Sequence, residues 1–295
     1  MANTRTVLIT GCSEGGLGDQ LAQTFHARGL RVLATARNLD SIKHLTGQGI
    51  ETLPLDVTSP ESISSCVETV SKLTGGSLDI LLNNAGGGYT MPLADVDIET
   101  GKKVFEANVW GFLRVTQAFL PLLLKSSHPA GGFVVNNTSA VSVIANPIAG
   151  VYNMSKAAAG MMTETLRLEL MPFGIKVIDL KTASVRSRFY DKQAQGPKAR
   201  LPEDSIYSPA RDVVENIMTE GSVGLKFMPQ EDWAKEVVES LLKRDPAPHI
   251  WSGASATLIR VLTSIVPFTW RDSTMLKMGG LDILSQRLKD QKKVQ

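Results

Sequence analysis

The sequence contains little cysteine, little histidine and no long apolar run. Its two cysteines, Cys12 and Cys66, are too few for a disulfide framework or a cysteine zinc site, and its four histidines lack the spacing of metal ligands. The most apolar late stretch, residues 256–270, is interrupted by Arg260 and Pro267 and is too short to span a bilayer. The sequence therefore predicts no metal centre, no disulfide-stapled fold and no membrane-spanning helix.

An excess of one charge is missing as well. The 31 basic residues nearly balance the 29 acidic ones, and the one basic cluster, at residues 289–295, is typical of a solvated tail. Without a basic stripe, nucleic acid is not an expected partner. The first ten residues run directly into a strand pattern without a signal peptide, and the few cysteines suit a reducing compartment. A cytoplasmic location is expected.

The chain does contain short β-branched runs that alternate with longer helical patterns. The runs show little polar alternation, as expected of parallel strands buried on both faces. The expected strands are 5–10, 31–36, 51–57, 78–83, 132–138, 175–181 and 249–253. The expected helices are 17–28, 60–74, 98–126, 151–172, 209–220 and 230–243. This order predicts a Rossmann-type α/β fold, with one doubly wound parallel sheet in a single domain.

Residues 182–229 differ in character, because they are rich in Pro, Ser, Arg and Gly. Long insertions at the carboxyl end of a strand are often lids or binding loops. We therefore expect a dinucleotide-binding and catalytic core at 1–181, a substrate lid at 182–229 and a helical C-terminal extension at 230–295. The side chains expected to cover an apolar substrate are Phe189, Tyr190, Ile206, Tyr207, Phe227 and Met228.

A glycine-rich turn, TGCSEGGLG at residues 10–18, joins the first expected strand to the first expected helix. Glycine lets the backbone approach a ligand closely, and the amino end of a helix offers free N–H groups to a pyrophosphate. The position of the turn at a strand-to-helix joint supports a dinucleotide site. No Gly-Lys-Ser/Thr follows, which excludes a nucleotide-triphosphate P-loop.

The end of the second expected strand bears on the choice of cofactor. Binders of NAD usually carry an acidic residue there, whereas this chain has Ala36 followed by Arg37. A guanidinium suits a 2′-phosphate, to which Ser13 adds a hydroxyl, so the pattern predicts NADP(H). Glu14 is an unfavourable charge for this interpretation unless it faces solvent. The alternative is that Arg37 is an ordinary surface residue.

Six motifs in chain order resemble those of the short-chain dehydrogenase/reductase family and cover residues 5–181. The glycine turn is similar to the family's Thr-Gly-xxx-Gly-x-Gly turn with one residue added. The others are LDV at 55–57, NNAG at 83–86, NVWG at 108–111, NTSA at 137–140 and YNMSK at 152–156. The resemblance implies an oxidoreductase that interconverts a ketone and a secondary alcohol of a small molecule, and a homo-oligomer.

The resemblance assigns catalysis to Asn108, Ser139, Tyr152 and Lys156. Tyr152 and Lys156, four residues apart, share a helix face. Because free tyrosine titrates near about 10, the ammonium of Lys156 is expected to lower the Tyr152 pKa, and also to hold the nicotinamide ribose. Ser139 would polarise the carbonyl, and Asn108 would position a water for proton relay. The implied cofactor contacts are Gly11, Ser13, Gly16, Leu17, Gly18, Arg37, Asp56, Asn83, Ala85, Gly86, Tyr152, Lys156, Val185 and Ser187.

The segment after the sixth expected strand departs from the family pattern. It reads KTASVRSRF, with Ala183 in place of a glycine and Ser187 in place of the threonine that usually meets the carboxamide and the phosphate. Serine keeps the hydroxyl group of threonine, so we still expect Ser187 to bind the cofactor. Arg186 and Arg188 either face solvent or meet an anionic group of the cofactor or substrate.

Later segments, among them 201–207 and 228–242, resemble a fungal subgroup of the family that includes the yeast 1-acyldihydroxyacetone-phosphate reductase. An apolar or lipid-like substrate is therefore expected, with a terpenoid, steroid-like or polyketide substrate as the alternative. A nucleotide-sensing protein without turnover is a further alternative, although a sensor would not need all four catalytic residues. The apolar C-terminal section is interpreted as a core or interface helix, and alternatively as a peripheral contact with a lipid droplet or the endoplasmic reticulum.

Overall fold

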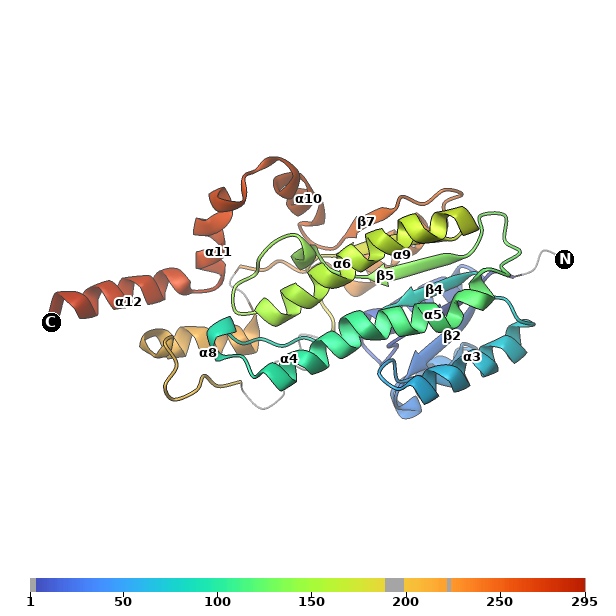
Figure 1. Ribbon diagram of the computed structural model, residues 1–295, viewed down its shortest axis with the longest axis horizontal. Helices are drawn as coiled ribbons and strands as arrows, with labels where there is room; N and C mark the ends of the chain where they lie inside the picture. Colours follow the sequence, from blue (N-terminus) through green and yellow to red (C-terminus); the bar gives the residue numbers. More distant parts are fainter. Residues whose placement is uncertain (1–3, 189–198, 222–223, 295) are drawn as a thin grey trace.

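Seven parallel strands form one sheet in the order β3-β2-β1-β4-β5-β6-β7 (Figure 1). The computed structural model describes residues 4–188, 199–221 and 224–294. The strands are β1 (Thr6–Ile9), β2 (Arg31–Ala36), β3 (Glu51–Pro54), β4 (Ile80–Asn83), β5 (Phe133–Asn137), β6 (Lys176–Thr182) and β7 (His249–Ser252). The chain runs outward from β1 to β3 and then returns to place β4 beside β1. The carboxyl ends of β1 and β4 thus flank the switch point at which such sheets bind ligands.

The helices follow the strands as a doubly wound fold requires, which confirms the predicted fold class. They are α1 (Leu17–Ala27), α2 (Lys43–Thr46), α3 (Pro60–Thr74), α4 (Ile98–Phe105), α5 (Gly111–Leu123), α6 (Gly150–Leu170), α8 (Arg211–Glu220), α9 (Gln230–Leu241), α10 (Ala256–Ile265), α11 (Asp272–Met278) and α12 (Leu281–Val294). Local chemistry sets their ends. For α3, the Ser59 hydroxyl accepts from the Ser62 N–H, Pro60 occupies the first turn, and Gly75 ends the helix in the left-handed conformation.

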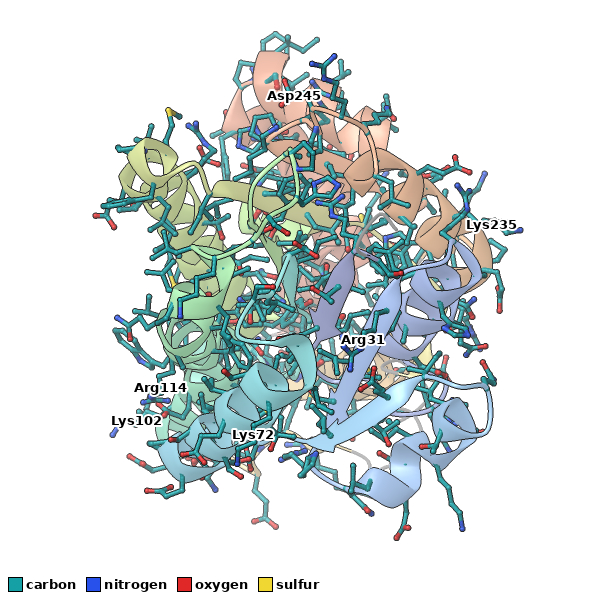
Figure 2. All side chains as sticks on the ribbon, turned by 90° about the vertical axis from the view of Figure 1, so that its right-hand side faces the viewer. Arg31, Lys72, Lys102, Arg114, Lys235 and Asp245 are labelled. Atoms are coloured by element: carbon teal, nitrogen blue, oxygen red, sulfur yellow. The ribbon has the colours of Figure 1, made fainter. Side chains whose placement is uncertain are left out.

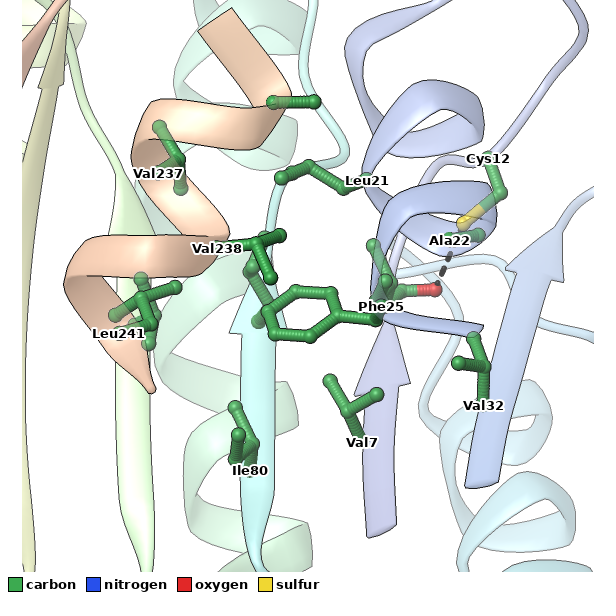
Figure 3. Packing of buried hydrophobic residues seen from close by; sticks show 14 of the residues in the cluster. Val7, Cys12, Leu21, Ala22, Phe25, Val32, Ile80, Val237, Val238 and Leu241 are labelled. Atoms are coloured by element: carbon green, nitrogen blue, oxygen red, sulfur yellow. Dashed lines mark hydrogen bonds between the residues drawn. The ribbon is translucent and has the colours of Figure 1, made fainter. Parts of the chain in front are cut away.

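The helices α1 and α9 cover one face of the sheet. Phe25 of α1 is fully buried and packs between α9 residues such as Leu241 and strand residues such as Val7 (Figure 3). The Cys12 thiol lies at the top of this layer and donates to the Ile9 carbonyl oxygen at 3.3 Å. Burial raises the pKa of this thiol to about 12, which makes it a packing residue and not a nucleophile.

The helices α3, α5 and α6 cover the opposite face. Figure 2 shows Lys102 and Arg114, on α4 and α5, on the other side of the sheet from Lys235 of α9. The expected single helix at 98–126 is interrupted by a π-helical turn at Glu106–Trp110, which separates α4 from α5. Such turns insert an extra residue, which shifts the phase of the side chains beyond it and is hard to detect from periodicity.

The described part of the expected lid is packed. Leu201, Val214, Ile217 and Met218 form a small core with Ile148, and the ion pair of Arg287 with Asp212 joins α12 to α8. The ribbons of these two helices lie near each other in Figure 1. Of the residues expected to cover substrate, Phe189 and Tyr190 lie outside the described residues. The side chain of Ile206 is exposed to solvent, and that of Met228 packs against the main core.

Within the described ranges, no helix combines the length and the apolar character that crossing a membrane would require.

Candidate active site

The glycine turn lies at the carboxyl end of β1 with no room for side chains at two of its positions. Gly11 has φ +74°, and a Cβ built there would lie 2.7 Å from the Ala85 Cα. A Cβ on Gly18 would lie 2.5 Å from the Gly11 carbonyl oxygen. Both positions therefore require glycine, and Gly16 caps α1, whose free N–H groups point toward the turn. This is a backbone cradle suited to a pyrophosphate.

Asn84 fastens this turn to the neighbouring strands. Its amide nitrogen donates to the carbonyl oxygens of Thr10 and Gly11 at 2.9 and 3.0 Å, and its amide oxygen accepts from Asn137 at 2.9 Å. The N–H groups of Asn84 and Ala85 both donate to the Thr10 hydroxyl at 2.9 Å. The ends of β1, β4 and β5 are thereby held together. Asn84 was not among the predicted site residues, although it stands within the NNAG motif.

The predicted cofactor residue Asn83 instead points its side chain into the interior. Its amide nitrogen donates to Thr116 at 3.0 Å and to Asn136 at 2.8 Å, and the residue is only 1% exposed. Its amide group supports the sheet at this point. Ala85 and Gly86 continue the chain toward the catalytic cluster, where a Cβ on Gly86 would lie 2.8 Å from the Asn108 amide oxygen.

Arg37 and Asp56 lie close enough at the rim beyond β2 for their charges to interact, while Ser13 stands in the glycine turn. Arg37 is exposed to solvent, and the Ser13 hydroxyl lies 3.1 Å from that of Ser41. Burial tends to raise the Asp56 pKa, but hydrogen bonds from Thr58 and the nearby charge of Arg37 outweigh it and lower the pKa. Asp56 is therefore an anion beside the Arg37 cation, and the guanidinium keeps its outer face open to solvent.

The segment after β6 closes over the glycine turn. The Arg188 N–H donates to the Gly15 carbonyl oxygen at 2.9 Å, and its guanidinium lies 3.8 Å from the Glu14 carboxylate. Glu14 faces solvent, as the NADP(H) interpretation required. Val185 and Ser187 are buried. The Arg186 guanidinium lies 5.7 Å from the Phe227 ring centre. The TASVRS segment therefore reaches the cradle despite its departures from the family pattern.

Tyr152 and Lys156 lie in the first two turns of α6, as their spacing predicted. The Lys156 ammonium donates to the Asn137 carbonyl oxygen at 2.8 Å and lies 5.8 Å from the Tyr152 ring centre and 5.4 Å from that of Phe112. Burial lowers the pKa of Lys156 to about 8, while the charge of Asp179 acts in the opposite direction. With a pKa of about 8 the amine is mostly protonated at pH 7, so it is a cation beside the phenol.

Asn108 stands in the π-helical turn and is fully buried. Its amide nitrogen donates to the Gly87 carbonyl oxygen and to the Ser155 hydroxyl, both at 2.9 Å, and its amide oxygen accepts from the Gly87 N–H at 2.9 Å. The Ser155 hydroxyl in turn donates to the Tyr152 carbonyl oxygen at 2.8 Å. Asn108 therefore ties the loop after β4 to the turn that carries Tyr152. The predicted water-positioning role stays a prediction.

Ser139 lies at the end of β5, and its hydroxyl donates to the Thr182 carbonyl oxygen at 3.2 Å. The hydroxyl accepts from the Val141 N–H at 3.3 Å. Both contacts are long, and a hydroxyl rotates freely about its C–O bond. The predicted role of Ser139 toward a substrate oxygen stays a prediction.

A buried ion pair under the site was not predicted. Asp179 is 1% exposed and accepts hydrogen bonds from the Thr138 hydroxyl and the Lys181 ammonium. Lys181 also donates to the Ser142 hydroxyl at 3.2 Å. The sequence signal was the pair Asp179 and Lys181 near the carboxyl end of a strand whose other interior residues are apolar. Among the residues that the structure describes, no cluster of three or more His, Cys, Asp or Glu side chains is placed to hold a metal ion.

Comparisons with known proteins agree with this geometry. A family model described as short chain dehydrogenase matches residues 5–198. A short-chain dehydrogenase/reductase of Pestalotiopsis microspora is 47% identical over 285 residues, which cover 97% of each chain. The NADPH-dependent 1-acyldihydroxyacetone phosphate reductase of Schizosaccharomyces pombe is 38% identical over 273 residues, or 88% of this chain and 90% of that one. The crystal structure of a short-chain dehydrogenase from Streptomyces avermitilis superposes with a TM-score of 0.73 at 24% identity, covering 100% and 98% of the two chains.

Proposed function

The chain belongs to the short-chain dehydrogenase/reductase family, and from that premise we propose that it is an NADP(H)-dependent oxidoreductase that interconverts a ketone and a secondary alcohol on an apolar or lipid-like substrate. The observation that carries the proposal is the Tyr152–Lys156 pair, held on Asn137 beside a glycine cradle at the switch point of the sheet.

The cradle fits the cofactor, because Gly11 and Gly18 let the turn pack directly against Ala85 and Asn84, and the start of α1 then offers its N–H groups to a pyrophosphate. Arg37 is the cation for the 2′-phosphate, and its outer face is open to solvent. The NADPH dependence named for the Schizosaccharomyces pombe relative supports this assignment. Arg188 closes the same cradle from the β6 side and screens Glu14 from the phosphates.

The bound cofactor supplies the hydride, and the residues of the chain handle the proton. Lys156, fixed by the Asn137 carbonyl, stabilises the phenolate form of Tyr152, so that the phenol gives up its proton to a substrate oxygen at neutral pH. Ser139 turns its hydroxyl from Thr182 toward the same oxygen and stabilises the negative charge that develops on it. Asn108 and Ser155 hold the Tyr152 turn in place.

The name of the Schizosaccharomyces pombe relative supports a lipid-like ketone, such as an acyl-dihydroxyacetone phosphate. A terpenoid, steroid-like or polyketide alcohol or ketone is the alternative within the same chemistry. A homo-oligomer is part of the proposal, supported by the exposed apolar side chains of Trp110, Met154, Met161 and Leu168. The lid role of 182–229 and a cytoplasmic location, with or without peripheral lipid contact, stay predictions.

The test is oxidation of NADPH by the purified protein with a panel of ketones: an acyl-dihydroxyacetone phosphate, a terpenoid ketone and a steroid ketone. NADH is the matched control cofactor, and the Tyr152→Phe variant is the control for background oxidation. The proposal is supported if at least one ketone is turned over and if that turnover depends on both NADPH and Tyr152. No turnover with any ketone, together with no alcohol oxidation by NADP+, contradicts it.

A further inference from the structure

A cavity of about 300 Å³ borders the turn of α6 that carries Tyr152, with Gly150 and Asn153 in its wall. Its remaining walls come from the 144–148 segment, from Leu93 with Tyr207, and from residues 268–281, here called the C-terminal arm. Most of the lining is apolar. The volume is at the lower end of the range of ligand pockets, about 300–1,000 Å³.

The cavity wall is held in place tightly. A Cβ on Gly279 of the arm would lie 2.7 Å from Pro147, so the arm sits directly on the segment that leads into α6. In that segment Ile148 has φ +67° and is buried, although a β-branched residue rarely adopts such a conformation. Strain of this kind persists only where the surroundings enforce it, and it concentrates at binding sites.

Arg271 of the arm brings an unusual group to this cavity. Two of its guanidinium nitrogens, Nε and Nη1, are buried and have no hydrogen-bond partner within the described residues. The guanidinium lies 4.7 Å from the Phe268 ring centre, which shields one face. Asp272 also lines the cavity, but in the described chain no ion pair joins it to Arg271 and its own side chain is exposed to solvent. Buried donors without an acceptor are costly, so these N–H groups call for an acceptor that the described residues do not supply.

Asn153 adds a complementary group. Its amide nitrogen donates to the Asn146 carbonyl oxygen at 2.8 Å, but its amide oxygen is buried without a partner. Arg271 and Asn153, each with buried polar atoms that have no partner among the described residues, therefore stand in the wall of a mostly apolar cavity that also holds the Asp272 carboxylate. This arrangement suits an apolar ligand that carries an oxyanion and a hydroxyl group.

We propose that this cavity binds the part of the substrate that carries an oxyanion, either a carboxylate or a phosphate, and that Arg271 selects substrates for it. The Asn153 amide oxygen accepts a hydrogen bond from the same ligand. This inference rests on the proposed function in one respect, since it takes the ligand of the cavity to be the ketone whose oxygen Tyr152 protonates.

The kinetic test compares two matched pairs of ketones with NADPH. One pair is hexadecanoyl-dihydroxyacetone phosphate and its dephosphorylated form, and the other is 9-oxodecanoic acid and its methyl ester. The wild type should use the anionic member of at least one pair with a kcat/KM about tenfold higher or more, and the responding pair tells phosphate from carboxylate. Arg271→Gln should lower that ratio at least about tenfold, mainly through KM, and Arg271→Lys should retain part of it. Lys277→Gln, which removes an exposed cation of α11 outside the cavity, should leave the ratio unchanged.

A binding test without turnover separates this inference from the proposed function. Calorimetry with decanoate and decanol should show tighter binding of decanoate in the wild type, and Arg271→Gln should abolish the difference. If no ketone is reduced but decanoate binding depends on Arg271, the proposed function fails and the oxyanion site stands. If ketones are reduced while both the kinetic ratio and decanoate binding are the same in wild type and Arg271→Gln, the oxyanion site is overturned and the function stands.

Discussion

Lys156→Met should make the free protein more stable at neutral pH while abolishing its activity. Burial lowers the Lys156 pKa from its ordinary value of 10.5 to about 8. At about 1.4 kcal/mol per pH unit, that difference means that the buried ammonium costs the folded state roughly 3 kcal/mol at pH 7. The variant escapes this cost but leaves the Asn137 carbonyl oxygen without its donor, which costs about 1–2 kcal/mol. The net expectation is a gain of about 1–2 kcal/mol.

The difference in unfolding free energy between the two proteins should depend on pH. Between pH 8 and 10.5 the unfolded lysine keeps its proton while the folded one has lost it, so the unfolded state binds more protons. The stability contributed by this group in the wild type therefore rises with pH through that window, by roughly 3 kcal/mol in all. The variant lacks this rise, so its advantage at pH 7 should disappear and reverse by about pH 10.5.

Urea unfolding of both proteins without cofactor, at several pH values from 7 to 10.5, measures this difference. Titrating groups remote from Lys156 contribute equally to both proteins and cancel, and both proteins carry Tyr152→Phe in this measurement because the phenol is expected to be coupled to the amine. A difference in unfolding free energy that stays flat over this range, or a variant that is the less stable protein at pH 7, would refute the reasoning that Lys156 is a costly buried cation.

Three further predictions concern the site and the core. Tyr152→Phe should abolish turnover and leave NADPH affinity nearly intact, because only the proton donor is lost. If the variant keeps more than a tenth of the wild-type rate in a stopped assay, Tyr152 is not the acid–base residue. Arg37→Asp should reverse the cofactor preference, since it removes the 2′-phosphate partner and adds a ribose acceptor; unchanged fluorescence-titration affinities for both NADPH and NADH would show that Arg37 is a surface residue. Phe25→Ala should lower the free energy of unfolding by about 3–5 kcal/mol, because this ring is fully buried between α9 and the sheet; a loss below about 1 kcal/mol in urea would contradict that packing.

The sheet and its switch point could be predicted because each step depends on local pattern. Apolar runs such as 78–83 have no alternation and therefore indicate buried parallel strands, and a glycine turn after the first run indicates the cradle. Tyr152 and Lys156 could be placed on one helix face from their spacing alone. Proton chemistry could be assigned only through the resemblance to a family.

What sequence reasoning missed depends on contacts between distant segments. The interior orientation of Asn83 follows from Thr116 and Asn136, which only the folded sheet brings near it. The π-helical turn at Asn108 adds one residue to a helix whose periodicity looks continuous in the sequence. The helix at 209–220 was predicted, but its packing against Ile148 could not be foreseen, because that contact joins segments that are distant in the sequence.

The buried Asp179 also constrains which substitutions the chain can accept, and in what order. Its carboxylate is shared by two ammonium groups, since it binds Lys181 directly and its charge also acts on Lys156. Losing Lys181 first leaves one acid near one remaining amine, whereas losing Asp179 first leaves two buried cations with no anion between them. A lineage can therefore lose Lys181 and afterwards Asp179, whereas the reverse path crosses an intermediate that folds poorly, so Asp179 is expected to be lost only where Lys181 has already been lost.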